Sequence, residues 1–150
     1  MFHTLTRSAL ILLALTFAAC SYGEGDGNDL ILDGTYRGSG LAIVGNAADP
    51  GTTNVTVAAT FDQTTVGALE AGMEVTITVF GGPPETYAGT LTGTLGSDGA
   101  LSLDGQLPGG VSNGNGTNVI LVDLDGEAST TRIEATMFGS FQVPNLVLTR

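Results

Sequence analysis

The chain has 150 residues, with 15 acidic side chains, four arginines and no lysine, so its formal net charge is −11 at pH 7. Nucleic acids and anionic lipid surfaces are both bound through lysine and arginine, and this charge balance argues against either as a partner. Cys20 is the only cysteine, so no disulfide can form within the chain, but the length is enough to bury a core without one.

The first twenty residues have the anatomy of an export signal. Arg7 precedes a mainly apolar run, residues 8–17, and the small residues Ala18 and Ala19 lead directly to Cys20. A positive region, an apolar run of about 7–15 residues and small residues before the cut site define a secretory signal. The run is too short to cross a bilayer, which takes about 20 residues. We therefore expect residues 1–19 to be removed as a signal peptide.

The residues around Cys20 resemble the lipobox of bacterial lipoproteins, in which a lipid is attached to the cysteine thiol and the chain is cut just before it. Ala18, Ala19 and Cys20 match the pattern, whereas Phe17 stands where a smaller residue is usual. The alternative is an ordinary signal peptide with an incidental cysteine, but a lone exported thiol has no partner within the chain. The resemblance implies lipidation of Cys20 by acyl chains such as palmitate, and several chains are enough for stable anchoring.

This resemblance also implies a location and a domain organisation. Ser21, in place of aspartate, is similar to lipoproteins sent to the outer membrane in hosts with two membranes; in any host we expect an exported protein held in the cell envelope. Residues 20–29 would be the lipidated cysteine and a flexible Gly-rich acidic tether. Residues 30–150 would form a single domain. With three arginines against 15 carboxylates, the mature chain has a net charge near −12.

Eight segments of the domain are rich in β-branched or alternating apolar residues and are bounded by Gly, Asn, Asp or Pro. Such segments are typical of short strands, because successive side chains of a strand point to opposite faces. The predicted strands cover residues 35–44, 54–61, 73–80, 86–95, 100–107, 117–124, 127–137 and 141–149.

Turn residues separate the predicted strands. Asp98-Gly99 is the clearest hairpin turn, since both residue types tolerate positive φ, and Asp125-Gly126 is predicted to be a second. We expect a turn or bulge at Asp33-Gly34 and an edge or bulge at Pro144, because proline cannot donate to a strand ladder. Residues 68–71 could form a single helical turn.

The pattern predicts an all-β fold, an antiparallel meander of about eight strands. An up-and-down barrel is favoured, because full closure removes exposed strand edges. Gly89 and Gly93 share one face of the segment 86–95, and glycines repeated at this period mark the bends of a sheet that curls into a barrel. A two-sheet β-sandwich is the alternative.

Residue types that are missing limit the chemistry. His3 lies in the signal, so the mature chain has no histidine, no lysine and no free thiol once Cys20 is lipidated. Catalysis by Ser-His-Asp or Cys-His groups, a Schiff-base lysine and a zinc site of His and Cys ligands are therefore excluded within one chain. We expect a protein that is not an enzyme and holds no organic cofactor.

Asp123, Asp125 and Glu127 form the best acidic group in the sequence. If a strand runs through all three, they share one face and could ligate calcium, which takes 6–8 oxygen ligands. If Asp125-Gly126 is a turn, the carboxylates diverge and the site disappears. The competing interpretation is an acidic surface in water, and we favour it.

Gly34-Thr35-Tyr36 resembles the opening Gly-x-Trp of lipocalin-like barrels, with tyrosine in place of tryptophan. The resemblance covers these three residues and implies that a late arginine, Arg132, packs on the aromatic ring. The competing interpretation is that Tyr36 is simply a core or rim aromatic residue.

Two functions remain open for the domain. In the first, the barrel interior, or its mouth beside the polar loop 108–118, binds a small apolar ligand, a lipid or an envelope component. In the second, the barrel is filled by its own side chains, and an outer face rich in threonine at Thr90, Thr92 and Thr94 meets an envelope protein or a polysaccharide.

Overall fold

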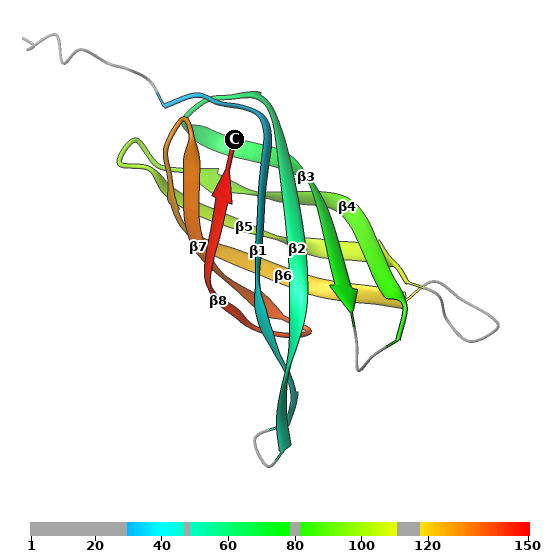
Figure 1. The fold of residues 1–150 in the computed structure, drawn as a ribbon. Helices are drawn as coiled ribbons and strands as arrows, with labels where there is room; N and C mark the ends of the chain where they lie inside the picture. Colours follow the sequence, from blue (N-terminus) through cyan, green and yellow to red (C-terminus); the bar gives the residue numbers. More distant parts are fainter. Residues whose placement is uncertain (1–29, 47–48, 79–81, 111–117) are drawn as a thin grey trace, which may run out of the picture.

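The computed structural model describes residues 30–46, 49–78, 82–110 and 118–150 (Figure 1). Within these ranges every regular element is a strand, and no helix is long and apolar enough to cross a membrane. The strands are β1 (Leu32–Asn46), β2 (Asp49–Thr64), β3 (Gly67–Thr78), β4 (Pro84–Leu95), β5 (Ala100–Gly109), β6 (Asn118–Ala128), β7 (Arg132–Gly139) and β8 (Val143–Thr149).

Each strand pairs antiparallel with the next, and β8 returns to β1 to close the barrel. The predicted up-and-down barrel is confirmed, and the sandwich alternative is wrong. The first described residues and the C-terminus lie at the same end, which is the upper end in Figure 1. The chain therefore enters the barrel at this end.

Alternation of buried and exposed residues, broken in β8 at Pro144 and Asn145, separates the inside of the barrel from the outside. In β3, Met73, Val75 and Ile77 are buried, whereas Glu74 between them is exposed. Side chains that alternate in this way place one apolar face inward along every strand. The largest fully buried side chains are Leu32, Tyr36, Phe61, Leu91, Leu95, Leu103, Leu107, Leu124, Ile133, Met137, Leu146 and Leu148.

Tyr36 and Phe61 are the largest rings in this core. They meet edge to face, with ring centroids 5.6 Å apart and planes at 88°, which is a favoured arrangement for aromatic pairs. The Tyr36 hydroxyl donates a hydrogen bond to the carbonyl oxygen of Thr130 over 2.9 Å. A buried phenol is thereby satisfied at the upper end of the core.

One predicted local element is wrong. Residues 68–71 form no helical turn; they belong to β3 and pair with β4, from Ala68 opposite Thr94 to Ala71 opposite Leu91. The reason is tertiary, because Leu69 and Ala71 continue the inward face that Met73 and Val75 begin. Burial of that face outweighs the weak helical preference of the segment.

The predicted irregularities are confirmed at three positions. Gly34 has a φ of 81° and lies at a register shift between β1 and β2. At the Asp98-Gly99 turn, the Gly99 amide donates to the Gly96 carbonyl over 3.0 Å and the Ala100 amide to an Asp98 carboxylate oxygen over 3.1 Å. Near Pro144, the pairing of β7 with β8 shifts register.

Candidate functional site

The three predicted metal ligands lie on one strand and one face. Asp123, Asp125 and Glu127 are alternate residues of β6, and all three are exposed on the outside of the barrel. The Ser102 hydroxyl of β5 donates a hydrogen bond to an Asp125 carboxylate oxygen over 2.6 Å. The strand therefore runs through all three carboxylates, as one of the two sequence alternatives required.

The predicted hairpin turn at Asp125-Gly126 is wrong for a steric reason. Gly126 pairs with Leu101 on one side and Ala135 on the other. A Cβ added to Gly126 would overlap the carbonyl oxygen of Glu134. The glycine is thus needed where two backbones approach closely inside the sheet, and the chain turns instead after Ala128.

Neighbouring strands add further carboxylates to this face. Asp104 of β5 lies directly opposite Asp123, and Glu134 of β7 lies directly opposite Glu127. Glu134 also pairs with Arg132 through Nε and Oε1 at 2.6 Å, but both side chains are more than half exposed. We call Asp104, Asp123, Asp125, Glu127 and Glu134 the acidic face.

A shallow groove of about 300 Å³ runs along this part of the wall, between β6 and β8. Its lining includes the carboxylates Asp125, Glu127 and Glu134, together with Thr136 and Asn145. The groove is open to solvent on the outside of the barrel and presents three negative charges along its wall.

The carboxylates line a wall without converging on a point. In the described parts of the chain, no three His, Cys, Asp or Glu side chains are grouped closely enough to hold a metal ion. Calcium at Asp123, Asp125 and Glu127 remains a prediction, and the arrangement is that of an extended acidic surface.

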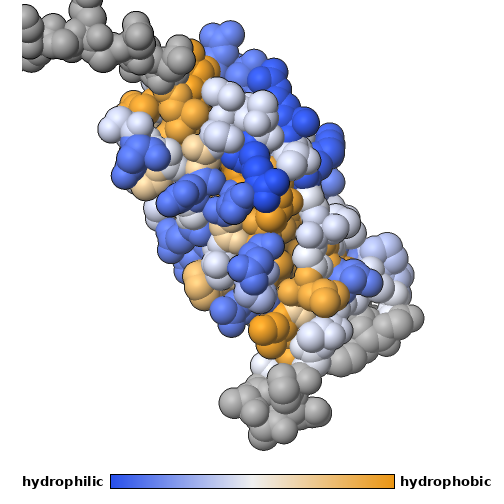
Figure 2. Space-filling model, turned by 60° about the vertical axis from the view of Figure 1, so that its left-hand side comes forward, coloured by the Kyte–Doolittle hydropathy of each residue, from blue (hydrophilic) through white to orange (hydrophobic). Residues whose placement is uncertain are grey.

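Apolar side chains occupy the same outer wall below the acidic face. Val119 and Leu121 of β6 and Phe138 of β7 are exposed to 51%, 54% and 41%. Phe138 lies directly opposite Asp123, and the Leu121 amide donates to the Ser140 hydroxyl beside it over 2.9 Å. We call Val119, Leu121 and Phe138 the apolar group. Figure 2 shows that apolar surface on one side of the barrel lies at the upper end, in the middle and in the lower part, among hydrophilic and neutral surface.

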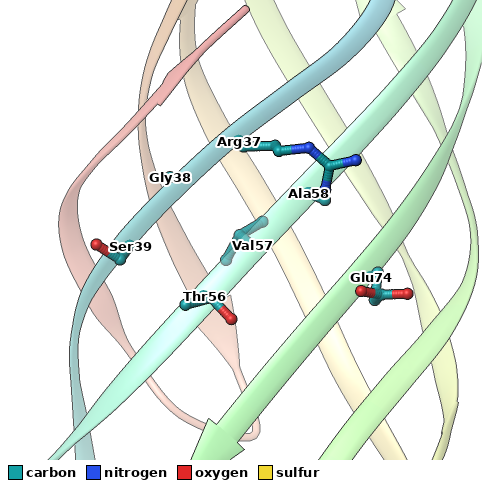
Figure 3. A pocket seen from close by; sticks show the side chains of 7 residues that line it. All are labelled: Arg37, Gly38, Ser39, Thr56, Val57, Ala58 and Glu74. Carbon is teal, nitrogen blue, oxygen red and sulfur yellow. The ribbon is translucent and has the colours of Figure 1, made fainter.

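A second groove, of about 380 Å³, crosses β1, β2 and β3 (Figure 3). Arg37 extends from β1 over the small Ala58 of β2, and Glu74 stands on β3 beyond it. The three residues occupy one row of the outer wall, because Arg37 pairs with Ala58 and Ala58 with Glu74. A cation and an anion thus flank a shallow floor made by a methyl group.

The residues of the lipocalin-like motif occupy the start of β1. Tyr36 is fully buried, and this burial raises the pKa of its phenol, an effect that the positive charge of Arg150 partly offsets. Arg132 points outward to Glu134, whereas Arg150 lies beside Gly34. Arg150, and not Arg132, is therefore the late arginine near this motif.

A second tyrosine marks the lower half of the barrel. Burial and a hydrogen bond to Glu85 both raise the pKa of Tyr87. Its hydroxyl donates to a Glu85 carboxylate oxygen over 2.7 Å. This pair lies near Gly110, and Tyr87 itself pairs with Gly109 of β5.

Two sequence predictions fall outside the described residues. Cys20 and the predicted tether precede residue 30, the first described residue. Residues 111–117, the central part of the predicted loop 108–118, also lie outside the described ranges. The described ends of that loop belong to β5, which runs through Gly109, and to β6, which begins at Asn118.

Comparison with known proteins gave no match to a family model, to a curated protein or to a solved structure. The candidate site therefore stands on its own geometry.

Sequence reasoning missed the partners of the acidic strand. Asp104 and Glu134 join Asp123 and Glu127 only through strand register, and the mistaken turn at Asp125-Gly126 placed Glu127 on the wrong strand. The outward positions of Val119 and Leu121 could have been found from the alternation with Ile120 and Val122, which are buried.

Proposed function

We propose that the chain is a lipid-anchored envelope protein whose filled barrel acts as an interaction module. The anchor would be acyl chains on Cys20, and residues 21–29 would tether the barrel to the membrane. The barrel itself would present its outer wall to another component of the envelope, without turning over a substrate or holding a small ligand inside.

The observation that carries this proposal is the packed interior. The inward positions of the strands hold large apolar side chains, among them Tyr36 and Phe61 in edge-to-face contact. An eight-stranded barrel is just wide enough for its own side chains to fill. Binding would then have to use the outside, where the grooves described above lie.

A second candidate is the binding of a small apolar ligand, and one hollow favours it. A surface hollow of about 590 Å³ lies at the upper end of the barrel, lined in part by Leu30, Ile31 and Ala128. Ligand sites are commonly concave and mostly apolar, with a few polar groups. Asp98 and Thr130 supply polar atoms there. This hollow is at the tethered end, opposite the loop 108–118 that the sequence favoured.

The native mass of the protein, purified gently with and without a chelator, distinguishes these functions. A filled interaction module predicts the mass of the chain and its acyl groups alone. Extra mass that is lost on denaturation would instead support the small-ligand function. Extra mass that only the chelator removes would support calcium at the acidic face.

The lipid anchor is tested separately by Cys20→Ala. This variant should leave the membrane fraction and take up no labelled palmitate, whereas the unchanged chain should stay in the membrane fraction and incorporate the label. Retention of Cys20→Ala in membranes, with undiminished palmitate uptake, would contradict the anchor.

A further inference from the structure

We propose that the outer wall of β5, β6 and β7 docks a basic segment of another protein, with the acidic face receiving its Lys or Arg side chains and the apolar group receiving an apolar side chain. This inference rests on the proposed interaction function and adds to it a surface and a chemical class of partner.

The two halves of the surface are continuous. One row of the sheet runs from Asp104 through Asp123 to Phe138, which are directly opposite one another on β5, β6 and β7. Leu121 precedes Asp123 by two residues on the same outer face of β6. A partner that covers Phe138 and Leu121 therefore also meets the Asp123 carboxylate.

The charge arrangement is unfavourable in the isolated domain. Like charges directly opposite each other on a sheet are destabilising, and this face places Asp104 opposite Asp123 and Glu127 opposite Glu134. Arg132 offsets one of these pairs through Glu134. Cations of a partner would remove the remaining repulsion between carboxylates, and this would stabilise the bound state relative to the free domain.

The groove gives such a cation a place to bind. Asp125 and Glu127 of β6 and Glu134 of the adjacent β7 line a hollow of about 300 Å³ that extends to β8. Arginine forms the strongest ion pairs with carboxylates, because its planar fork can donate two parallel hydrogen bonds. The exposed Leu121 and Phe138 provide the apolar contact that charge pairing alone lacks.

Charge also selects among occupants. A second copy of the chain carries the same net charge near −12 after removal of residues 1–19, and an anionic lipid surface is negative as well. Both would meet this wall with repulsion, whereas a basic protein segment complements it. The apolar group favours a segment with at least one exposed apolar residue over a purely ionic partner.

The test is site-specific photo-crosslinking in the cells that naturally produce the full chain. Leu121→p-benzoylphenylalanine places the probe in the apolar group, and Thr56→p-benzoylphenylalanine places it at an exposed position of β2, on the opposite side of the barrel, as a matched control. The expected product at position 121 is a cross-link to another protein, at a segment that mass spectrometry shows to contain Lys or Arg beside an apolar residue. Its yield should fall severalfold in the background Asp123→Asn, Asp125→Asn.

Several outcomes would overturn the proposal. These are a cross-link at position 121 no stronger than at position 56, a cross-link to a second copy, a cross-linked segment without basic residues, or a yield that neutralising the two aspartates leaves unchanged. A strong cross-link at position 56 alone would reject this surface while leaving the interaction function standing.

Neutralisation also separates binding from folding. Because Asp123 faces Asp104, Asp123→Asn should leave the melting temperature of the protein unchanged or raise it slightly, while the yield of the cross-link falls. A fall in melting temperature would assign these carboxylates a structural role and contradict the proposal.

Discussion

The two edges of β1 are held in different ways. Along one edge, β1 pairs with β2 in a ladder that runs from Leu32 to Asn46 with a single register shift. Along the other edge, the closing seam with β8, one strand pair joins Arg37 to Thr149. Lower down, a single bridge joins Ile43 to Gln142 through two backbone hydrogen bonds of 2.7 and 3.2 Å.

Side chains and close backbone approach replace the missing ladder at the closing seam. Near its upper end, Tyr36 donates across the barrel to the Thr130 carbonyl in the turn between β6 and β7, and Arg150, just after β8, lies 3.6 Å from an Asp33 carboxylate oxygen. Between the two backbone pairings, Gly38 faces Val147 so closely that no side chain fits. Closure of this barrel therefore depends on particular side chains, whereas the β1–β2 edge depends on regular backbone pairing.

The largest effect is expected for Gly38→Ala. A Cβ at this position would overlap the Val147 carbonyl and lie 2.9 Å from a methyl group of Leu148, so β8 would have to move away from β1. Overpacking of this kind costs about 1–3 kcal/mol. The free energy of unfolding, measured in urea, should fall by that amount, and amides of β8 should exchange faster with solvent.

Gly72→Ala is the matched control on the regular side of the barrel. Gly72 lies in β3 with nothing closer than 3.9 Å to an added Cβ, so alanine is accommodated. Because alanine lowers the conformational entropy of the unfolded chain relative to glycine, this variant should be more stable by about 0.4–1 kcal/mol. If the two variants unfolded alike, the contrast between the closing seam and the regular ladders would be wrong.

Much of this fold could be predicted from alternation alone. The inward faces of β3 and β4 were identified, because Met73, Val75 and Leu91 alternate with polar residues that turned out to be exposed. The Asp98-Gly99 turn fixes the register of β4 and β5 within a few residues. Closure itself was predicted, but the residues that meet across the closing seam were not, since the pairing of the first strand with the last leaves no local signal.

The candidate site was less predictable for the same reason. Asp123 and Asp125 could be placed on one face of a strand, but Asp104 and Glu134 meet them only through cross-strand register. The turn between β6 and β7 was misplaced, because Asp-Gly is a strong turn signal and also a dipeptide in which glycine permits close strand approach. Only the neighbouring backbone at Glu134 distinguishes the two uses of Gly126.

Tyr36→Phe tests the side-chain contribution to the closing seam. Loss of the hydrogen bond to Thr130 should cost about 0.5–1.5 kcal/mol at neutral pH. Burial raises the pKa of Tyr36 above the usual value near 10, so the native state holds this proton more tightly than the unfolded chain. The corresponding stability is complete below the unfolded pKa and is lost as pH rises through the higher native pKa.

The expected signature is a pH profile of urea unfolding. The unchanged protein should lose stability above about pH 10, and Tyr36→Phe should lose less over the same range. Tyr87→Phe serves as a comparison, because the pKa of Tyr87 is also raised but its hydroxyl pairs with Glu85 far from the closing seam. Identical alkaline profiles for Tyr36→Phe and the unchanged protein would show that Tyr36 does not carry this effect.

Substitutions of Asn145 test the backbone conformation of β8 beside the closing seam, and their expected effect is smaller. Its φ of 55° is in the left-handed region, beside the register shift between β7 and β8. Asparagine and glycine tolerate this conformation better than alanine. We expect Asn145→Gly to unfold at nearly the same urea concentration as the unchanged protein and Asn145→Ala to lose up to about 1 kcal/mol. Equal loss in both would indicate that the Asn145 side chain, and not its backbone angle, matters.

The smallest effect is expected for Arg150→Gln. The Arg150 and Asp33 side chains are each about half exposed, and an ion pair in that setting contributes about 0.2–1 kcal/mol. The loss should be visible in low salt and should vanish near 1 M NaCl, where the Debye length is about 3 Å.

Asp33→Asn should reproduce the loss, and the double variant should show no further loss, if the two charges act as a pair. A salt-independent loss would instead assign the role of Arg150 to the packing of its guanidinium group, which lies beside Gly34 where β1 begins. Closure at the upper end would then depend on packing in the same way as it does at Gly38.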